Sequence, residues 1–191
     1  IGSTLSSIAI YNELISDKVK TKPELVPQLS EKISVHINEL MHHTEDIIWS
    51  LKIGPHQNET MSKRVQEYAT ELLDSKQIQS HIEIESDVEQ LLQHPEQRRN
   101  MLLIIKEAMN NCTKYSQAKN FTVNMFVQQT QLLLDVMDDG IGFDQAKTVF
   151  GDGIQNIKNR CKNLNGRCEI KSEPGKGTSI HCELPISSYT K

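Results

Sequence analysis

Apolar positions in the first quarter of the chain follow the period of two amphipathic helices. Between Leu5 and Val19 they recur at alternating spacings of three and four, which is the seam of a coiled coil. The pattern stops at residues 20–23 and resumes from Pro27 to Leu51 as a second helix, roughly 37 Å long at about 1.5 Å per residue. A hairpin of two such helices leaves part of its seam uncovered, so we expect a second copy to complete a dimeric four-helix bundle.

The pattern changes after a break around residues 53–59. Helical periodicity is found near 61–73, 96–115 and 154–164, and strand-like segments lie near 81–85, 121–127, 131–137, 167–171 and 178–184. Helices interleaved with largely antiparallel strands predict an α+β fold, an α/β sandwich with the sheet on one side and helices on the other. We therefore expect a hairpin domain over 1–53, a linker over 54–60 with a hinge at Gly54-Pro55, and a second domain over 61–191.

Composition narrows the class of protein. The chain has 191 residues, of which 37% are hydrophobic and 24% charged, as in ordinary soluble domains. Its 21 Lys and Arg are outnumbered by 25 Asp and Glu, so we expect no nucleic-acid partner. No apolar run approaches the roughly 18 residues of a membrane span, and we expect a cytoplasmic chain. It does not begin with Met, so we expect it to be part of a longer protein, whose other segments can include a membrane anchor.

The four cysteines, Cys112, Cys161, Cys168 and Cys182, form no C-x-x-C pair. A structural zinc site or a disulfide framework would need closer spacing. We interpret them as reduced, mostly buried thiols.

A carboxylate ends an apolar strand face. With a period of two, Asp138 shares a face with Leu132, Leu134 and Val136, and no cation is adjacent in sequence. Burying an unpaired ion costs several kcal/mol, about 3 or more, so a hydrogen-bond donor from a ligand is a suitable partner. The alternative is that Asp139-Gly140 only forms a turn at the end of the strand.

A second group of polar residues lies on the preceding helix. Glu107, Asn111 and Lys114 are spaced four and three apart and fall on one stripe. Carboxylate and amide oxygens suit Mg²⁺, and an ammonium suits a phosphate. A solvated helix face is the alternative, although the adjacent Asn110-Asn111 pair is unfavourable in the middle of a helix.

Glycines form the third feature. Gly151-Asp152-Gly153 directly precedes the predicted helix at Ile154, where free N–H groups and the helix dipole favour an anion. Gly175-Lys176-Gly177-Thr178 follows later in the chain. Neither segment is a P-loop or a Rossmann fingerprint.

The order of these motifs resembles the ATP-binding (GHKL, or Bergerat) domain shared by gyrase, a heat-shock chaperone, MutL and bacterial sensor histidine kinases. Residues 106–116 resemble the N box, and residues 138–143 resemble the first glycine box. Residues 151–154 and 175–178 resemble the later glycine boxes, and residues 166–185 fit the closing strands of the family.

The resemblance implies a cavity for ATP. Asp138 would accept a hydrogen bond from the adenine amino group, with Gly142 against the base and Thr178 near it. Gly140 and Gly177 belong to the same ATP-binding set.

It also implies roles at the phosphates. Asn111 would hold Mg²⁺, Lys114 and Tyr115 would contact the phosphates, and Glu107 would be the general base that polarises the incoming histidine. Gly151 and Gly153 would belong to a short lid that closes over the phosphates, with residues 144–150 between the glycine boxes.

The first helices resemble the dimerisation and phosphotransfer hairpin of the subfamily paired with nitrate-responsive-type regulators. Residues 1–6 fit the segment that follows a His-Asp pair in that subfamily, so the phosphoacceptor histidine would precede Ile1, and this chain alone would bind ATP without phosphorylating itself. Ser3 replaces the glutamine that supports phosphatase action in the subfamily.

The function implied is an autophosphorylating protein histidine kinase that passes phosphoryl to an aspartate of a response-regulator receiver domain. Two alternatives stay open: a nucleotide-gated dimer without phosphotransfer, and an anti-sigma-type serine kinase. The long helical hairpin argues against the serine kinase.

Overall fold

The computed structural model describes residues 2–52, 59–92, 94–145 and 152–186. The chain divides into two compact units, Ile1–Leu51 and Lys52–Lys191. Most of the predicted linker, including Gly54-Pro55, lies outside the described residues. Within the described part, no helix combines the length and the apolar character that crossing a membrane requires.

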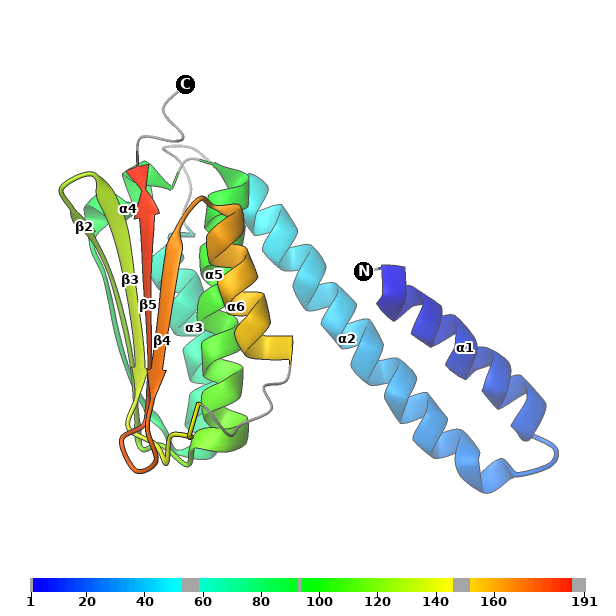
Figure 1. Ribbon diagram of the computed structural model, residues 1–191. Coiled ribbons are helices and arrows are strands. Elements are labelled where there is room, and N and C mark those ends of the chain that lie inside the picture. The colour runs from blue at the N-terminus through cyan, green and yellow to red at the C-terminus, as the bar shows by residue number, and fades with distance from the viewer. Residues whose placement is uncertain (1, 53–58, 93, 146–151, 187–191) are drawn as a thin grey trace. The chain divides into compact units, whose positions relative to one another are not determined.

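The first unit is a helical hairpin of α1 (Gly2–Lys18) and α2 (Val26–Leu51), joined through the short η1 (Pro23–Leu25) (Figure 1). The ring of Tyr11 stacks on His36 with 5.7 Å between centroids, and Lys32 Nζ lies 5.4 Å from the Tyr11 ring. These contacts join the two helices through aromatic and cation–π packing.

The hairpin leaves many apolar side chains in solvent. Leu29, Ile33 and Leu40 of α2 are half-buried, whereas Ile37 of the same helix is 44% exposed. The other exposed apolar side chains on the two helices include Leu5, Ile10, Leu14, Val35 and Met41. The apolar side chains of α2 thus fall into two groups: some pack within the hairpin, and the others are exposed to solvent.

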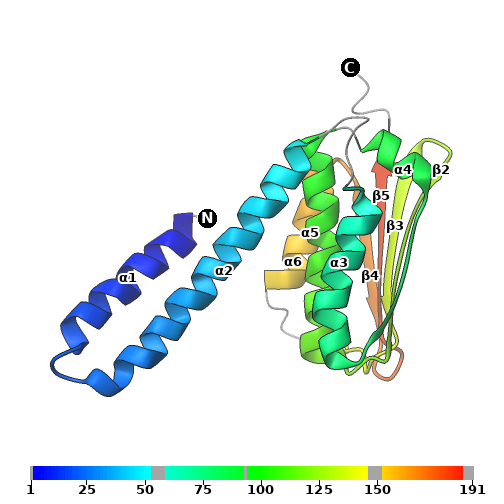
Figure 2. The same cartoon turned by 180° about the vertical axis from the view of Figure 1, so that it is seen from behind.

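The second unit contains a five-stranded sheet in the order β1-β2-β3-β5-β4. Its strands are β1 (Gln79–Ile84), β2 (Asn120–Gln128), β3 (Gln131–Asp138), β4 (Arg167–Ser172) and β5 (Thr178–Pro185). The β1–β2 pair is parallel and the other pairs are antiparallel. Figure 2 shows β2, β3, β5 and β4 side by side in this order. The register places Asp138 directly opposite Thr178, at the same end of the sheet.

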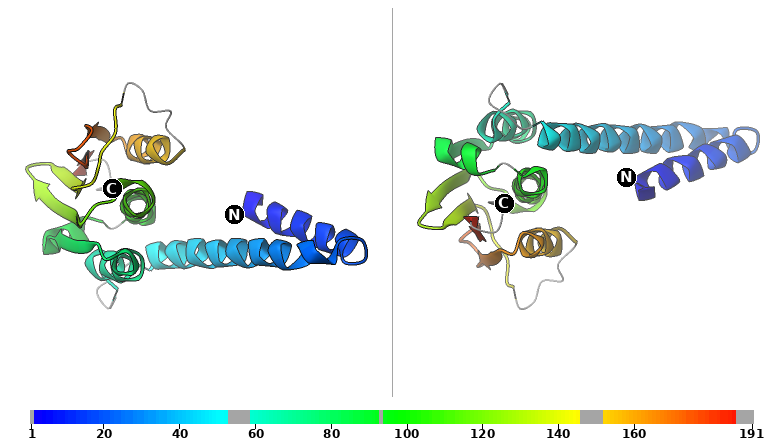
Figure 3. Two further views of the ribbon diagram at one scale, coloured as in Figure 1. Left: turned by 90° about the horizontal axis from the view of Figure 1, so that it is seen from below. Right: turned by 90° about the horizontal axis from the view of Figure 1, so that it is seen from above.

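Helices cover one face of this sheet, as the end-on views in Figure 3 show. They are α3 (Met61–Leu73), α5 (Pro95–Asn111) and α6 (Asp152–Asn163), while η2 (Asp74–Lys76) and α4 (Ser86–Leu91) are short connecting elements. The core lies between the two layers and includes Val65, Leu102, Ile105, Phe121, Val123, Leu134, Ile157 and Leu184. This arrangement confirms the predicted α+β sandwich.

The long predicted helix at 96–115 changes form before it ends. It is α-helical to Asn111 and continues as a π-helical turn, η3 (Cys112–Ser116). Gln117, with φ of 53°, ends the turn, and the Ser116 hydroxyl donates to the Cys112 carbonyl at 2.8 Å. A π turn widens a helix by one residue, often at a functional site, and hydrophobic periodicity does not reveal it.

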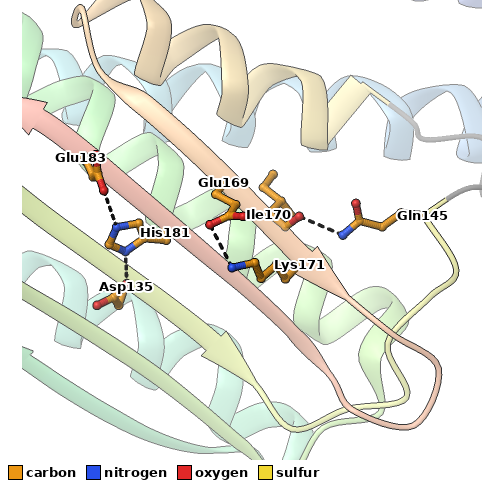
Figure 4. A network of polar contacts seen from close by, with 7 residues as sticks. All are labelled: Asp135, Gln145, Glu169, Ile170, Lys171, His181 and Glu183. Atoms are coloured by element: carbon orange, nitrogen blue, oxygen red, sulfur yellow. Dashed lines mark hydrogen bonds and ion pairs between the residues drawn. The ribbon is translucent and has the colours of Figure 1, made fainter.

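The opposite face of the sheet is polar. On β5, His181 lies between Asp135 of β3 and Glu183, with Nδ1 at 2.5 Å from the Asp135 carboxylate (Figure 4). At the edge strand β4, the Gln145 side chain donates to the Ile170 carbonyl at 2.8 Å. Charged side chains and a capped carbonyl protect an exposed sheet edge from pairing with another chain.

Candidate functional site

A cavity of about 570 Å³ lies in the second unit. Its wall is built from α5, η3, the start of α6 and the neighbouring ends of β3 and β5. Eight of the predicted site residues line it, namely Glu107, Asn111, Lys114, Tyr115, Asp138, Gly142, Gly153 and Thr178. Residues that the sequence placed in separate motifs therefore share one cavity.

One end of the cavity is apolar except for Asp138 and the neighbouring Thr178. The surrounding side chains are Phe121, Val136, Ile141, Ile170 and Ile180. The Gly140 N–H donates to Asp138 Oδ1 at 2.9 Å, and Thr178 also hydrogen-bonds to this carboxylate. Burial is the largest effect on the group and raises its pKa above the ordinary value. A donor from a ligand would therefore find a poorly solvated acceptor here.

A serine that the sequence gave no reason to select supports this end of the cavity. Ser172, the last residue of β4, donates from its hydroxyl to the Gly177 carbonyl at 2.8 Å and lies 3.2 Å from the Thr178 hydroxyl. Its oxygen accepts from the Phe143 N–H at 2.9 Å. One buried hydroxyl thus connects both glycine segments, and only the folded register brings these groups together.

Close backbone packing explains three of the predicted glycines. Gly142 and Gly177 have positive φ angles of 57° and 72°. A Cβ on Gly142 would collide with the Glu173 carbonyl, and one on Gly177 would collide with the Asp138 carbonyl. Gly140 is similarly blocked by Ser116. Gly140 and Gly177 do not line the cavity, so their contribution is to let its walls approach each other.

The other end of the cavity carries polar and charged groups. Glu107 and Asn111 project from α5, Lys114 and Tyr115 from η3, and Asp152 and Gly153 begin α6. A Cβ on Gly153 would collide with Glu107 Oε1 and would lie 3.3 Å from the Asn111 amide atoms. The start of α6 therefore packs directly on the predicted metal and base residues. Gly151 and most of the predicted lid, residues 146–151, lie outside the described residues.

The two adjacent asparagines have different surroundings. Asn110 donates from Nδ2 to the Tyr68 hydroxyl at 2.9 Å, away from the cavity lining, and Lys106 Nζ lies 4.5 Å from the Tyr68 ring centroid. Asn110 therefore connects α5 to α3, whereas Asn111 faces the cavity. The sequence could not distinguish these roles.

The two adjacent aspartates also differ. Asp139 accepts from the Lys119 and Asn120 N–H groups at 2.8 and 2.9 Å and from Asn120 Nδ2 at 2.7 Å. These bonds, those of Asn120 foremost, lower the pKa of Asp139. The strand-end turn expected as the alternative interpretation thus describes Asp139, and the cavity carboxylate is Asp138.

Comparison with known proteins agrees with this geometry. Residues 96–188 match the family described as "Histidine kinase-, DNA gyrase B-, and HSP90-like ATPase". The sensor histidine kinase LiaS of Bacillus subtilis is 34% identical over 126 residues, covering 65% of this chain and 35% of LiaS. The histidine-protein kinase/phosphatase UhpB of Salmonella typhimurium is 26% identical over 194 residues, covering 97% of this chain and 36% of UhpB.

Solved structures share the fold at low identity. The histidine kinase AdeS of Acinetobacter baumannii superposes with a TM-score of 0.60 and 14% identity, covering 97% of this chain and 96% of that one. A histidine kinase domain from a blue-light activated kinase of Erythrobacter litoralis gives a TM-score of 0.58 and 13% identity, covering 98% and 95% of the two chains.

The second unit is thus a nucleotide-binding domain of the histidine kinase, gyrase and heat-shock chaperone class of ATPases. Residues 96–188 carry the domain of this family, and outside them the chain is similar to sensor histidine kinases, because the match to UhpB extends over 97% of it. It spans about a third or less of the length of the first curated relatives it matches.

Proposed function

We propose that this chain is the core of an ATP-dependent protein histidine kinase of a two-component system. The γ-phosphoryl group of ATP would pass to a histidine and then to an aspartate of a response-regulator receiver domain. The observation that carries the proposal is one cavity with a half-buried carboxylate, Asp138, at its apolar end and Glu107 and Asn111 at its polar end. Such a cavity suits a flat base joined to a charged phosphate chain.

At the apolar end, the adenine amino group would donate to Asp138. The carboxylate is held by Gly140 N–H and Thr178, which fixes its orientation before the ligand arrives. Ile141, Ile170 and Ile180 would contact the faces of the base.

At the polar end, the donor set fits Mg²⁺. Asn111 supplies a hard amide oxygen on the cavity wall beside the Glu107 carboxylate, and the glycine at 153 leaves room next to both. When bound, Mg²⁺ would neutralise charge on the phosphate oxygens. Lys114 and Tyr115 would contact those oxygens from η3, because phosphoryl transfer depends mainly on positioning and charge neutralisation.

Glu107 would act on the attacking histidine. Its carboxylate would accept a hydrogen bond from one imidazole N–H, so that the other ring nitrogen presents its lone pair to the γ-phosphorus. Glu107 lies at the polar end of the cavity, beside the start of α6, and this location supports the proposed role.

The hairpin would form a homodimer in which the phosphoacceptor histidine, expected before Ile1, is presented to the second unit. The apolar side chains left exposed on α1 and α2 support this assembly. We further propose that this part of the longer protein lies in the cytoplasm, with its response regulator, whether or not the longer protein has a membrane anchor.

The test uses a version of the protein that includes the residues preceding Ile1. Incubation with γ-labelled ATP should give acid-labile, base-stable phosphate, as phosphohistidine does. Glu107→Gln should bind Mg-ATP normally and lose phosphorylation, whereas Asn111→Ala should lose the Mg²⁺ dependence of nucleotide binding with its melting temperature unchanged.

Two outcomes would contradict the proposal. Nucleotide binding without phosphohistidine would favour a nucleotide-gated dimer instead. Unchanged Mg²⁺-dependent affinity in Asn111→Ala would refute the metal assignment.

A further inference from the structure

Three of the four cysteines meet in the fold, although no short spacing joins them in the sequence. Cys161 lies on α6, Cys168 on the edge strand β4 and Cys182 on β5. Cys168 and Cys182 are directly opposite each other in the antiparallel β4–β5 pair. The three thiols influence one another's pKa values, so they form one cluster.

The three thiols differ in exposure and in ionisation. Cys161 and Cys182 are fully buried, whereas Cys168 is partly exposed. Hydrogen bonds from Cys161 and Cys182, with smaller contributions from the charges of Lys158 and His181, lower the pKa of the Cys168 thiol. The pKa values of the other two thiols are raised within the same cluster. The lowered pKa therefore falls on the sulfur that solvent can reach, and thiolate character with exposure determines susceptibility to oxidation.

We propose that Cys168 is an oxidation site and that hydrogen peroxide joins it to Cys182 in a reversible cross-strand disulfide. The Cys168 thiolate attacks one peroxide oxygen, the O–O bond breaks, and sulfenic acid and hydroxide form. The Cys182 sulfur then attacks the Cys168 sulfur and loses its proton, and water leaves. In total two thiols are oxidised and one peroxide is reduced to two waters.

Strand geometry supports this pairing. Directly opposed residues of antiparallel strands have Cα atoms about 4.5–5.5 Å apart, and disulfides need roughly 4.4–6.8 Å. Both side chains point to the helix-covered face, because Cys182 is buried beneath α6 and Cys168 shares its register position. The site is separate from the nucleotide cavity, whose lining contains none of these three cysteines.

The experiment treats the chain with hydrogen peroxide, removes the excess, alkylates the remaining thiols and maps peptides without reduction. The expected product has lost two alkylatable thiols and the mass of two hydrogen atoms, with the peptides of Cys168 and Cys182 linked until dithiothreitol is added. Cys182→Ser should stop at a sulfenic acid on Cys168 that dimedone traps. Cys112→Ser is the matched control and should form the same bridge.

The peptide map of the oxidised wild-type protein tests the Cys168–Cys182 disulfide even if a variant fails to fold. A bridge between other cysteines, a bridge between two chains, or over-oxidation of Cys168 without any bridge would overturn the proposal. Equal peroxide consumption by Cys168→Ser and the wild type would do the same.

Discussion

At the scale of single residues, the site depends on two neighbouring aspartates in opposite electrostatic situations. Asp138 is held in an apolar cavity, and burial raises its pKa, whereas backbone donors lower the pKa of Asp139. The first residue is thus costly to ionise and available to a ligand, while the second is already satisfied by the start of β2. A carboxylate in a cavity with a raised pKa is typical of a binding site.

Asp138→Asn should weaken ATP binding while stabilising the free protein. The amide replaces one acceptor oxygen by a donor, and losing a hydrogen bond to a charged group costs about 1.5–3 kcal/mol, or roughly ten- to a hundredfold in Kd. Titration calorimetry with ATP and urea unfolding at neutral pH measure both effects. Asp139→Asn is the matched control and should lower stability with a smaller effect on affinity; equal affinity in Asp138→Asn and the wild type would refute the assignment.

The same carboxylate predicts a pH dependence. Because its folded pKa is raised, the native state binds the proton more tightly than the unfolded state, so Asp138 contributes destabilisation above the folded pKa. This contribution disappears as the pH falls through the raised pKa toward the ordinary value of 3.8. ATP affinity, which needs the ionised form, should fall over the same range, and the Asp138→Asn variant should lack that dependence.

The sequence was sufficient to select eight of the residues that line the cavity, but not to separate the roles of adjacent residues. Asp138 was identifiable because it ends the apolar face of a strand, and the structure places Leu132, Leu134 and Val136 of that face in the core. Ser172 and the distinct roles of Asn110 and Asn111 were not identifiable, since both depend on contacts with residues more than five positions away, from other elements.

At the scale of elements, the start of α6 packs against Glu107 and Asn111 near the end of α5. Gly153 lies in the first turn of α6, where alanine would normally favour the helix by about 0.5–1 kcal/mol. Here a methyl group would displace Glu107 instead. A glycine is therefore needed at position 153 because of the contact with Glu107 of α5, and not because of the conformation of α6.

Gly153→Ala should lower phosphotransfer or Mg-ATP affinity with little loss of helix content. Gly2→Ala offers a matched control, because a Cβ at that helical glycine meets nothing within 4 Å, and it should leave Mg-ATP affinity and helix content unchanged. Calorimetry with Mg-ATP and circular dichroism check the pair. Equal Mg-ATP affinity in the two variants would show that the contact between α6 and Glu107 does not contribute to nucleotide binding.

The polar face of the sheet makes a second, pH-dependent contribution at this scale. The hydrogen bond with Asp135 is the largest cause that raises the pKa of His181. The stabilisation is fully present below the ordinary histidine pKa of 6.5 and is lost as the pH rises through the raised folded pKa. The difference in unfolding free energy between the wild type and His181→Gln should therefore be largest in mild acid and shrink at higher pH. Asp135→Asn should remove this trend; a constant difference would contradict the ion pair.

Element types were largely predictable because both periodicities are strong in this chain. The strands and helices of the second unit lie within a few residues of their predicted ranges. The short α4, the parallel partner of β1 and the π turn η3 were not predicted, because the first is too short to show a period and the others are properties of the assembled sheet and helix end.

At the scale of the whole molecule, the hairpin carries apolar surface that its own two helices do not cover. Ile37 is 44% exposed and Met41, one turn later, is 56% exposed. Exposed apolar rows of this kind mark association surfaces. The proposed dimer would cover them.

Ile37→Glu should shift the protein from dimer to monomer at micromolar concentration, because a carboxylate would be buried in the seam without a partner. Asn38→Glu adds the same charge at the next, also exposed position and should remain dimeric. Light scattering coupled to size exclusion measures both masses. A monomeric wild type at high concentration would contradict the bundle.

The division of the cavity into an apolar end and a charged end has a practical consequence for inhibitor discovery. An uncharged heteroaromatic amine could satisfy Asp138 and fill the space between the isoleucines without any phosphate mimic. Fragment screening against this end would thus begin from uncharged compounds, which avoid the cost of carrying a charge across a membrane.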